Sequence, residues 1–129
     1  MNRIVLSTGA IFGILAVILG AFGAHSLKEL ISPEAIQTFE TGVRYQMYHA
    51  LLLLIAGNSS FIPIKAKRLL FWMVLIGVLF FSGSIYGLAT NSLTAFDFKQ
   101  IGFITPIGGL LLILSWSVLL INFLKNRGN

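Results

Sequence analysis

The sequence predicts an all-α integral membrane protein: a bundle of four transmembrane helices with a short amphipathic helix at the membrane interface between the first two. The composition is the first observation, because 57% of the 129 residues are hydrophobic and only 10% are charged. The second is the recurrence of apolar runs close to the length, about 20 residues, that crosses a bilayer core about 30 Å thick. The third is the chain length, which accommodates about four such runs in one transmembrane domain, residues 1–129, and no separate soluble domain.

Residues 4–24 form the first predicted span, a run without a charged residue. A cleaved signal peptide is the alternative, since Ala21 to Gly23 has the spacing of a cleavage site, but the run exceeds the usual apolar core of such peptides, about 7–15 residues. Small residues recur every three or four positions along this run. We expect them to form a packing seam through Gly9, Gly13 and Gly20 that lets another helix approach closely. A path for a lipid or ligand is the alternative.

A helix start precedes the second predicted span, because Ser32 suits the N-cap and Pro33 the first helical position. Residues 33–42 are amphipathic with a period of 3.6, which predicts the interfacial helix, and residues 43–62 enter the membrane. The wholly apolar part, residues 50–57, covers only about 12 Å at the helical rise, against a bilayer core of about 30 Å. Polar groups of this span must therefore lie inside the membrane, where they need protein partners or water.

The third and fourth spans are predicted at residues 69–90 and 101–124. The second half of the third span is smaller and more polar than its first half, which suits close packing against another helix. Thr105-Pro106 and Gly108-Gly109 stand near the start of the fourth span, where they predict a kink.

The basic residues predict the orientation of the chain. Four spans place both termini and the loop after the second span on one side of the membrane. That side collects six of the nine basic residues: Arg3, Lys65, Lys67, Arg68, Lys125 and Arg127. The positive-inside rule then predicts a multi-pass protein of the cell membrane with both termini in the cytoplasm.

Polar residues from all four predicted spans fall in the outer half of the bundle, because the spans alternate in direction. The candidate ligand-binding residues in this half are His25, Arg44, Tyr45, Tyr48, His49, Ser82 and Tyr86. The cluster fits a water-accessible cup, a site for a lipid headgroup, or a hydrogen-bonded plug that specifies helix packing. Its expected partner is a membrane lipid, a small amphiphile or another protein.

Two of these residues carry open alternatives. Arg44 lies four residues after Glu40, which favours an intrahelical ion pair; a bound anionic headgroup or substrate, and simple extension of the side chain to the interface, are the alternatives. His49 lies one turn after Tyr45, which favours a hydrogen bond to a neighbour. Axial ligation of a haem together with His25, at the same membrane depth, is the alternative, and metal binding is another.

Several classes of function are excluded or disfavoured. The chain has no cysteine, which excludes disulfides, thiolate catalysis and cysteine-based metal centres. It carries no catalytic motif, and we expect no enzyme, no cofactor and no metal site. The basic residues are scattered, so no nucleic acid is expected. The alternatives to a binding protein are a small transporter or channel subunit that acts as a homo-oligomer, and a haem-bearing electron carrier that uses His25 and His49.

Four blocks of sequence carry a resemblance to a known family: residues 20–27 (GAFGAHSL), 39–50 (FETGVRYQMYHA), 81–86 (FSGSIY) and 105–109 (TPIGG). On these blocks, the chain resembles the domain-of-unknown-function 423 family of small bacterial membrane proteins, which is related to eukaryotic transmembrane protein 256. The resemblance covers nearly the whole chain and implies a four-helix integral membrane protein. It implies no activity and assigns no role to any residue.

Overall fold

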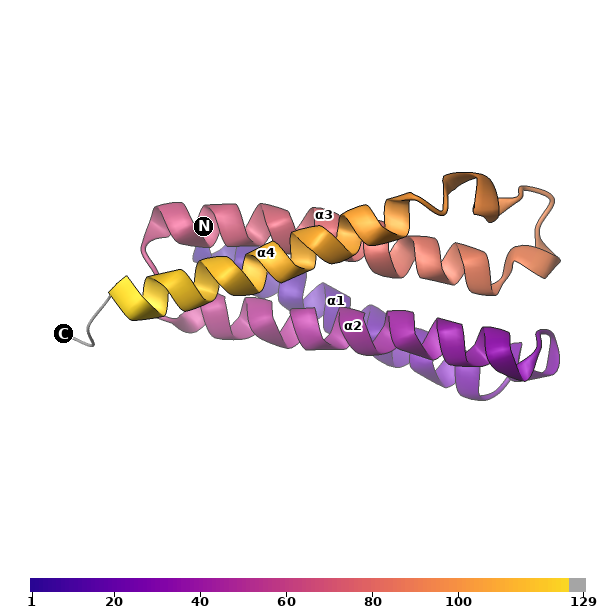
Figure 1. Ribbon diagram of the computed structural model, residues 1–129. Helices are drawn as coiled ribbons and strands as arrows, with labels where there is room; N and C mark the ends of the chain where they lie inside the picture. Colours follow the sequence, from indigo (N-terminus) through magenta and orange to yellow (C-terminus); the bar gives the residue numbers. More distant parts are fainter. Residues whose placement is uncertain (126–129) are drawn as a thin grey trace.

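The structure is a computed structural model that describes residues 1–125, and this part of the chain contains helices and no strand. The four long helices are α1 (Asn2–Ala24), α2 (Pro33–Asn58), α3 (Ile64–Ala89) and α4 (Ile104–Lys125) (Figure 1). Three short 3₁₀ helices lie in the connections: η1 (Leu27–Glu29), η2 (Asn91–Leu93) and η3 (Phe98–Ile101). The predicted all-α class is confirmed.

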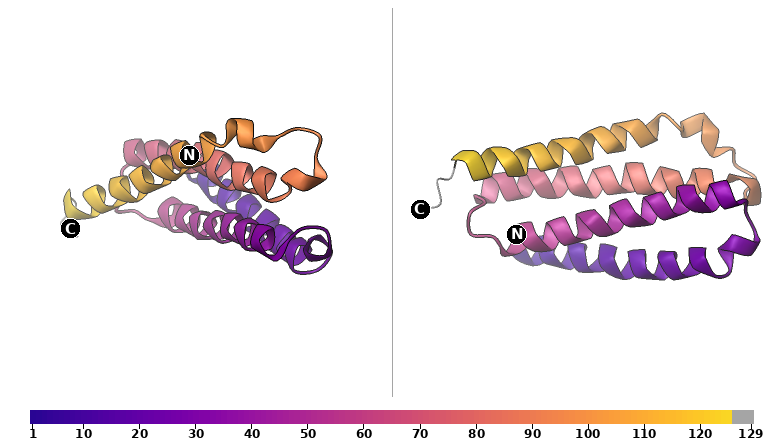
Figure 2. Two further views of the ribbon diagram at one scale, coloured as in Figure 1. Left: turned by 45° about the vertical axis from the view of Figure 1, so that its right-hand side comes forward. Right: turned by 60° about the horizontal axis from the view of Figure 1, so that its bottom comes forward.

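Each long helix packs mainly against its neighbours in the chain. Figure 2 shows in its right-hand view that the helices follow one another in chain order, with α1 and α4 on the outside. The start of α1 and the end of α4 lie at the same end of the molecule (Figure 1). The two central helices, α2 and α3, therefore connect two antiparallel pairs, α1 with α2 and α3 with α4.

Helix α2 is longer than either of the two segments predicted for it. Its start is as expected, because the Ser32 Oγ accepts a hydrogen bond of 3.1 Å from the Ala35 backbone N–H and Pro33 is the first helical residue. The predicted interfacial helix, 33–42, and the predicted span, 43–62, form one helix that passes through Gly42 and ends at Asn58. Because Gly42 has no side chain, the ring of Tyr86 on α3 fits against it: a Cβ atom at Gly42 would lie 2.7 Å from Cε1 of Tyr86.

Three helical segments in residues 1–125 are long and apolar enough to cross a membrane: α1 with η1 (Asn2–Glu29), α3 and α4. Helix α2 is not among these candidate spans, because its first half is polar. It nevertheless runs beside α1 for most of its length, since Gly57 of α2 contacts Leu6 and Phe39 of α2 contacts Gly23. A helix of 26 residues, at about 1.5 Å per residue, is as long as its neighbours.

All four helices contribute to one apolar core, which includes Val5, Leu53, Leu70, Val74 and Leu112. A smaller cluster of Leu27, Phe39 and Ala89 lies near the end of the molecule where α1 and α3 end and α2 begins. Many large apolar side chains on the outer helices are exposed, among them Ile14, Val17, Leu110 and Ile113. Exposed apolar surface of this kind suits contact with lipid.

The three glycines of the expected seam differ in their surroundings. A Cβ atom at Gly9 would lie 3.0 Å from the Ala50 carbonyl oxygen, so the backbones of α1 and α2 approach closely there. At Gly20 the nearest atom, on Val43, would be 3.5 Å away, and at Gly13 nothing lies within 4 Å. The close approach that was expected along the whole stripe is therefore present at Gly9 and absent at Gly13.

Candidate functional site

A buried glutamine on α2 connects three helices. Gln46 is only 4% exposed. Its Nε2 donates a hydrogen bond of 2.9 Å to the carbonyl oxygen of Phe12 on α1, and its Oε1 accepts one of 2.7 Å from the hydroxyl of Tyr86 on α3. Both ends of the amide are thus partnered within the protein, as a buried polar group requires.

Two serines on α3 extend this network in opposite directions. The hydroxyl of Ser82, which is buried, donates to the Gly42 carbonyl oxygen of α2 at 2.8 Å. Ser84 donates to the carbonyl oxygen of Phe81 and also shares a hydrogen bond with the hydroxyl of Thr105 on α4. Because the single proton of Ser84 is already used, Thr105 is the donor in the second bond. The polar part of α3 therefore joins both of its neighbours.

The histidine of α2 links that helix to α4. His49 is 3% exposed, and its Nε2 accepts a hydrogen bond of 3.0 Å from the indole N–H of Trp116. An indole nitrogen only donates, so Nε2 carries no proton. The proton lies on Nδ1, which donates to the Tyr45 carbonyl oxygen at 2.7 Å. His49 is thus a neutral side chain with both nitrogens occupied.

His25 lies apart from His49, and the expectation of equal membrane depth is wrong. His25 is the exposed residue at the end of α1, where its backbone N–H bonds to carbonyl oxygens of the last turn. Gly23 of the same turn contacts Phe39, which lies ten residues before His49 on α2. Ten residues correspond to about 15 Å along a helix. The structure therefore does not bring the two histidines to one haem, and His49 has no free nitrogen for an iron.

Arg44 has the expected partner. Its Nη1 lies 3.8 Å from Oε2 of Glu40, and its Nη2 donates a hydrogen bond of 3.2 Å to the hydroxyl of Thr41. The charged side chains are about half exposed, so a pair of this kind contributes only about 0.3–0.5 kcal/mol. Arg44 lies on the outward face of α2, outside the buried network.

A largely apolar groove separates α2 from α4, and we call it the α2–α4 groove. It contains two cavities, of about 430 Å³ and 300 Å³, which meet at the hydrogen-bonded pair of His49 and Trp116. Tyr45 lines both cavities and Tyr48 lines the larger one. The ring of Tyr45 packs 5.0 Å from that of Phe81 and 5.5 Å from that of Tyr48. Three aromatic side chains thus pack together along the groove.

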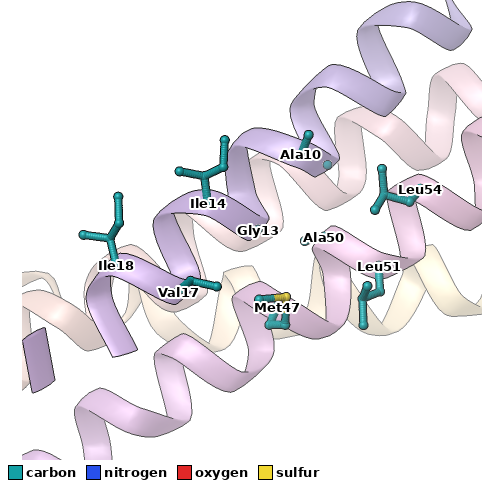
Figure 3. Close-up of a pocket in the computed structure, with 10 residues that line it drawn as sticks. Ala10, Gly13, Ile14, Val17, Ile18, Met47, Ala50, Leu51 and Leu54 are labelled. Atoms are coloured by element: carbon teal, nitrogen blue, oxygen red, sulfur yellow. The ribbon is translucent and has the colours of Figure 1, made fainter. Parts of the chain in front are cut away.

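A second groove, of about 510 Å³, lies between α1 and α2, and we call it the α1–α2 groove. Figure 3 shows Gly13, Ile14 and Val17 on its α1 side and Met47 and Leu51 on its α2 side. Every side chain that lines it is apolar. Its volume exceeds that of either cavity of the α2–α4 groove taken alone, but it offers no polar side chain to orient a ligand, which ligand sites usually have.

The seven predicted site residues fall into four settings. Tyr45, Tyr48 and His49 line the α2–α4 groove, whereas Ser82 and Tyr86 make buried bonds to α2. Arg44 is exposed one turn before Tyr48, and His25 lies elsewhere.

The predicted site omitted two residues that the structure makes central. Gln46 is one of several polar residues in its segment, and its hydrogen bonds to α1 and α3 have no local sequence signature. Trp116 lies in an apolar helix, and no sequence spacing indicates that its indole faces a histidine on another helix.

Comparison with known proteins gives a match of residues 19–109 to the family described as "Protein of unknown function (DUF423)". The chain is 39% identical over 126 residues to a UPF0382 membrane protein of Staphylococcus epidermidis, covering 98% of this chain and 99% of the relative. It is 36% identical over 125 residues to one of Bacillus subtilis (95% and 98%) and 36% identical over 127 residues to one of Haemophilus influenzae (98% and 98%). No solved structure matches the chain.

Proposed function

The chain belongs to the family of membrane proteins of unknown function described as DUF423, and we propose that this member is a non-enzymatic protein of the cell membrane that binds an anionic amphiphile in the α2–α4 groove. The observation that carries the proposal is the hydrogen bond between His49 and Trp116, which crosses a largely apolar groove. Small-molecule sites are typically apolar concavities with a few fixed polar groups.

The shape and charge of the groove suggest the class of ligand. Its two cavities take an apolar chain, which lies against Leu52, Ile55 and Ile113. Arg44 is the only basic residue of α2, and it is exposed one turn before Tyr48 at the edge of the groove. Because its ion pair with Glu40 is weak, an anionic headgroup competes for the guanidinium at little cost.

This proposal includes α2 as a fourth span. Polar side chains at membrane depth are costly unless they are partnered. Those of α2 that face the protein are partnered: Gln46 by Phe12 and Tyr86, and His49 by Trp116. Only groups with no remaining partner require water, so the helix can lie in the bilayer despite its low hydropathy.

The proposed orientation has both termini in the cytoplasm. The start of α1, the start of α3 and the end of α4 lie together, and five of the eight basic residues of the described chain lie there, which by the positive-inside rule favours the cytoplasmic side. The edge of the α2–α4 groove near Arg44 then faces the outer half of the bilayer. Cysteines introduced at Ala66 and Ser92 test this, since an impermeant thiol reagent should label only the second in intact cells.

A binding role also suits the chemistry of His49. A general base needs a nitrogen within reach of the substrate proton. Both nitrogens of His49 are held in hydrogen bonds that connect α2 and α4 and close one helical turn. The histidine is therefore a positioning residue for the groove in this proposal.

Tryptophan fluorescence tests the proposal, because the chain has two tryptophans and only Trp116 lies in the groove. The Trp72→Phe variant keeps Trp116 as its fluorophore, and we expect dibromostearate, added to the protein in detergent micelles, to quench it saturably. The matched control, Trp116→Phe, keeps Trp72, which is about as exposed as Trp116 but does not line the groove, and should show only unsaturated quenching.

The headgroup is tested in the same assay. Arg44→Gln should weaken binding of dibromostearate about fivefold, since one basic residue near a membrane surface contributes about 1 kcal/mol toward an anionic lipid. Binding of the uncharged dibromostearyl alcohol should not change. Equal, unsaturated quenching of both single-tryptophan proteins would contradict the proposed site.

A further inference from the structure

The two ends of the molecule differ sharply in charge. The end where α1 and α3 begin, which we call the basic end, carries five basic residues and no acidic residue within the described chain: Arg3, Lys65, Lys67, Arg68 and Lys125. The opposite end carries three basic and four acidic residues: Lys28, Arg44, Lys99, Glu29, Glu34, Glu40 and Asp97. All the carboxylate side chains of the protein are therefore remote from the basic end.

One lysine of the basic end is buried and fixed. Lys67 is only 6% exposed, whereas Lys65 and Arg68 beside it are exposed. Its Nζ donates a hydrogen bond of 3.0 Å to the side-chain oxygen of Asn2. An ammonium has three N–H donors, and Asn2 is the one acceptor that it reaches within residues 1–125. Among the described residues, the ammonium has no carboxylate partner, and one acceptor serves its three N–H groups.

This lysine also lies where two helix N-termini converge. Lys67 belongs to the first turn of α3, and its partner Asn2 is the first residue of α1. Neither first turn contains an acidic residue. The N-terminus of a helix carries a partial positive charge and unpaired N–H groups, and it favours an anion. Within residues 1–125, the ammonium and both helix ends thus lack the same negative partner.

We propose that the basic end holds the phosphate group of an anionic membrane lipid, with Lys67 as its central ligand. A phosphate accepts several hydrogen bonds at once and suits both an ammonium and the first N–H groups of a helix. A lipid is the source that fits the surroundings, because exposed apolar side chains of Ile4, Ile64 and Leu69 flank the site and offer contact to acyl chains. This site is at the opposite end of the molecule from Arg44, and it does not depend on the α2–α4 groove.

Native mass spectrometry of the protein in detergent, titrated with phosphatidylglycerol, tests this site. We expect Lys67→Gln to weaken binding about tenfold, since it removes a charge-assisted hydrogen bond from a fixed position. Arg68→Gln removes an exposed charge of the same sign one residue away and should weaken binding only about twofold. Lys67→Arg should retain most of the affinity. Equal losses for Lys67→Gln and Arg68→Gln would overturn the proposal.

Asn2→Asp separates binding from folding. The new carboxylate would pair with Lys67 inside the protein and suit the first turn of α1, so the melting temperature should not fall. The affinity for phosphatidylglycerol should drop at least as far as with Lys67→Gln, because the counter-charge is then built in. Unchanged affinity in a folded Asn2→Asp protein would contradict the site. Displacement of the lipid by millimolar inorganic phosphate would overturn the assignment to a lipid and identify soluble phosphate as the ligand.

Discussion

The two helix pairs of this protein use small residues differently. The α1–α2 pair is close at its ends, where Gly57 meets Leu6 and Gly23 meets Phe39, and at Gly9, where the two backbones approach each other. It leaves a groove of about 510 Å³ beside Gly13. The α3–α4 pair is closest around Gly108, where an added Cβ atom would overlap the backbone nitrogen of Phe81. Both pairs contain glycines, but two backbones come into contact only where the glycine of one helix faces a small residue or open backbone on the other.

The difference extends to hydrogen bonds. The α1–α2 pair is joined in its middle by the buried bond from Gln46 to the Phe12 carbonyl oxygen. The α3–α4 pair has the bond between Thr105 and Ser84 near one end and close backbone packing about one turn further along α4, at Gly108. In a bilayer, apolar packing gains nothing from expulsion of water, so shape and hydrogen bonds decide which helices associate. One pair relies more on shape and the other more on a buried polar side chain.

Gly108→Ala should have the largest effect on stability. The new methyl group would meet the backbone of α3, which cannot rotate away as a side chain does, so we expect a loss of about 3 kcal/mol, near the upper part of the usual range for overpacking. Gly13→Ala is the matched control. It faces open space and should leave stability unchanged or raise it by about 0.5 kcal/mol through helix propensity. Thermal unfolding in detergent measures both, and similar losses would break the comparison.

Gln46→Leu should be next in size. It leaves the Phe12 carbonyl oxygen and the Tyr86 hydroxyl without their partner, at a cost of about 2 kcal/mol. Tyr86→Phe removes only one of these bonds and should cost about 1 kcal/mol. In the double variant the second change should add little, because its partner is already absent. Additive losses in urea or thermal unfolding would show that the two side chains act independently.

Trp116→Phe tests the connection between the two pairs. It keeps an aromatic ring but removes the donor to His49, so we expect a loss of about 1 kcal/mol. It should also change hydrogen exchange around residues 45–52 more than in α1. Uniform exchange changes through the whole protein would mean that the bond does not specifically tie α2 to α4.

The smallest effect is expected for the exposed ion pair. Arg44→Gln should lower stability by only about 0.4 kcal/mol, and high salt should remove the difference from the wild type. A loss of 2 kcal/mol or more would place Arg44 among the structural residues and weaken its assignment as a headgroup contact.

Much of the fold followed from local sequence. The apolar runs predicted the helices, Ser32 and Pro33 predicted the start of α2, and the family membership confirms the resemblance carried by the four sequence blocks. Helix ends and the four family blocks each depend on residues that are adjacent in the chain, so they can be recognised from a single sequence. The membrane class was also predicted, because hydropathy depends on composition rather than on packing.

The contacts between helices did not follow in the same way. The stripe through Gly9 and Gly13 has one spacing, yet only Gly9 meets a backbone, because the outcome depends on the facing helix. The two histidines do not lie at the expected common depth. Counting spans predicts only which half of the bilayer a residue lies in, whereas His49 lies well inside α2 and His25 at the end of α1. Trp116 was missed because nothing in an apolar helix indicates which face meets a polar partner.

Packing between chain neighbours has a consequence for assembly in the membrane. In the proposed four-span arrangement, α2 and α4 each leave the insertion machinery with their main partner, α1 or α3, already in the bilayer. The contacts form over short sequence separations, so folding should be fast. Helix α2 is the one that most needs such a partner, because Gln46 would otherwise enter the lipid with an unpaired amide. Since α1 precedes α2 and presents the Phe12 carbonyl oxygen, the proposed arrangement implies that α1 is inserted first and supplies the acceptor for the Gln46 amide when α2 follows.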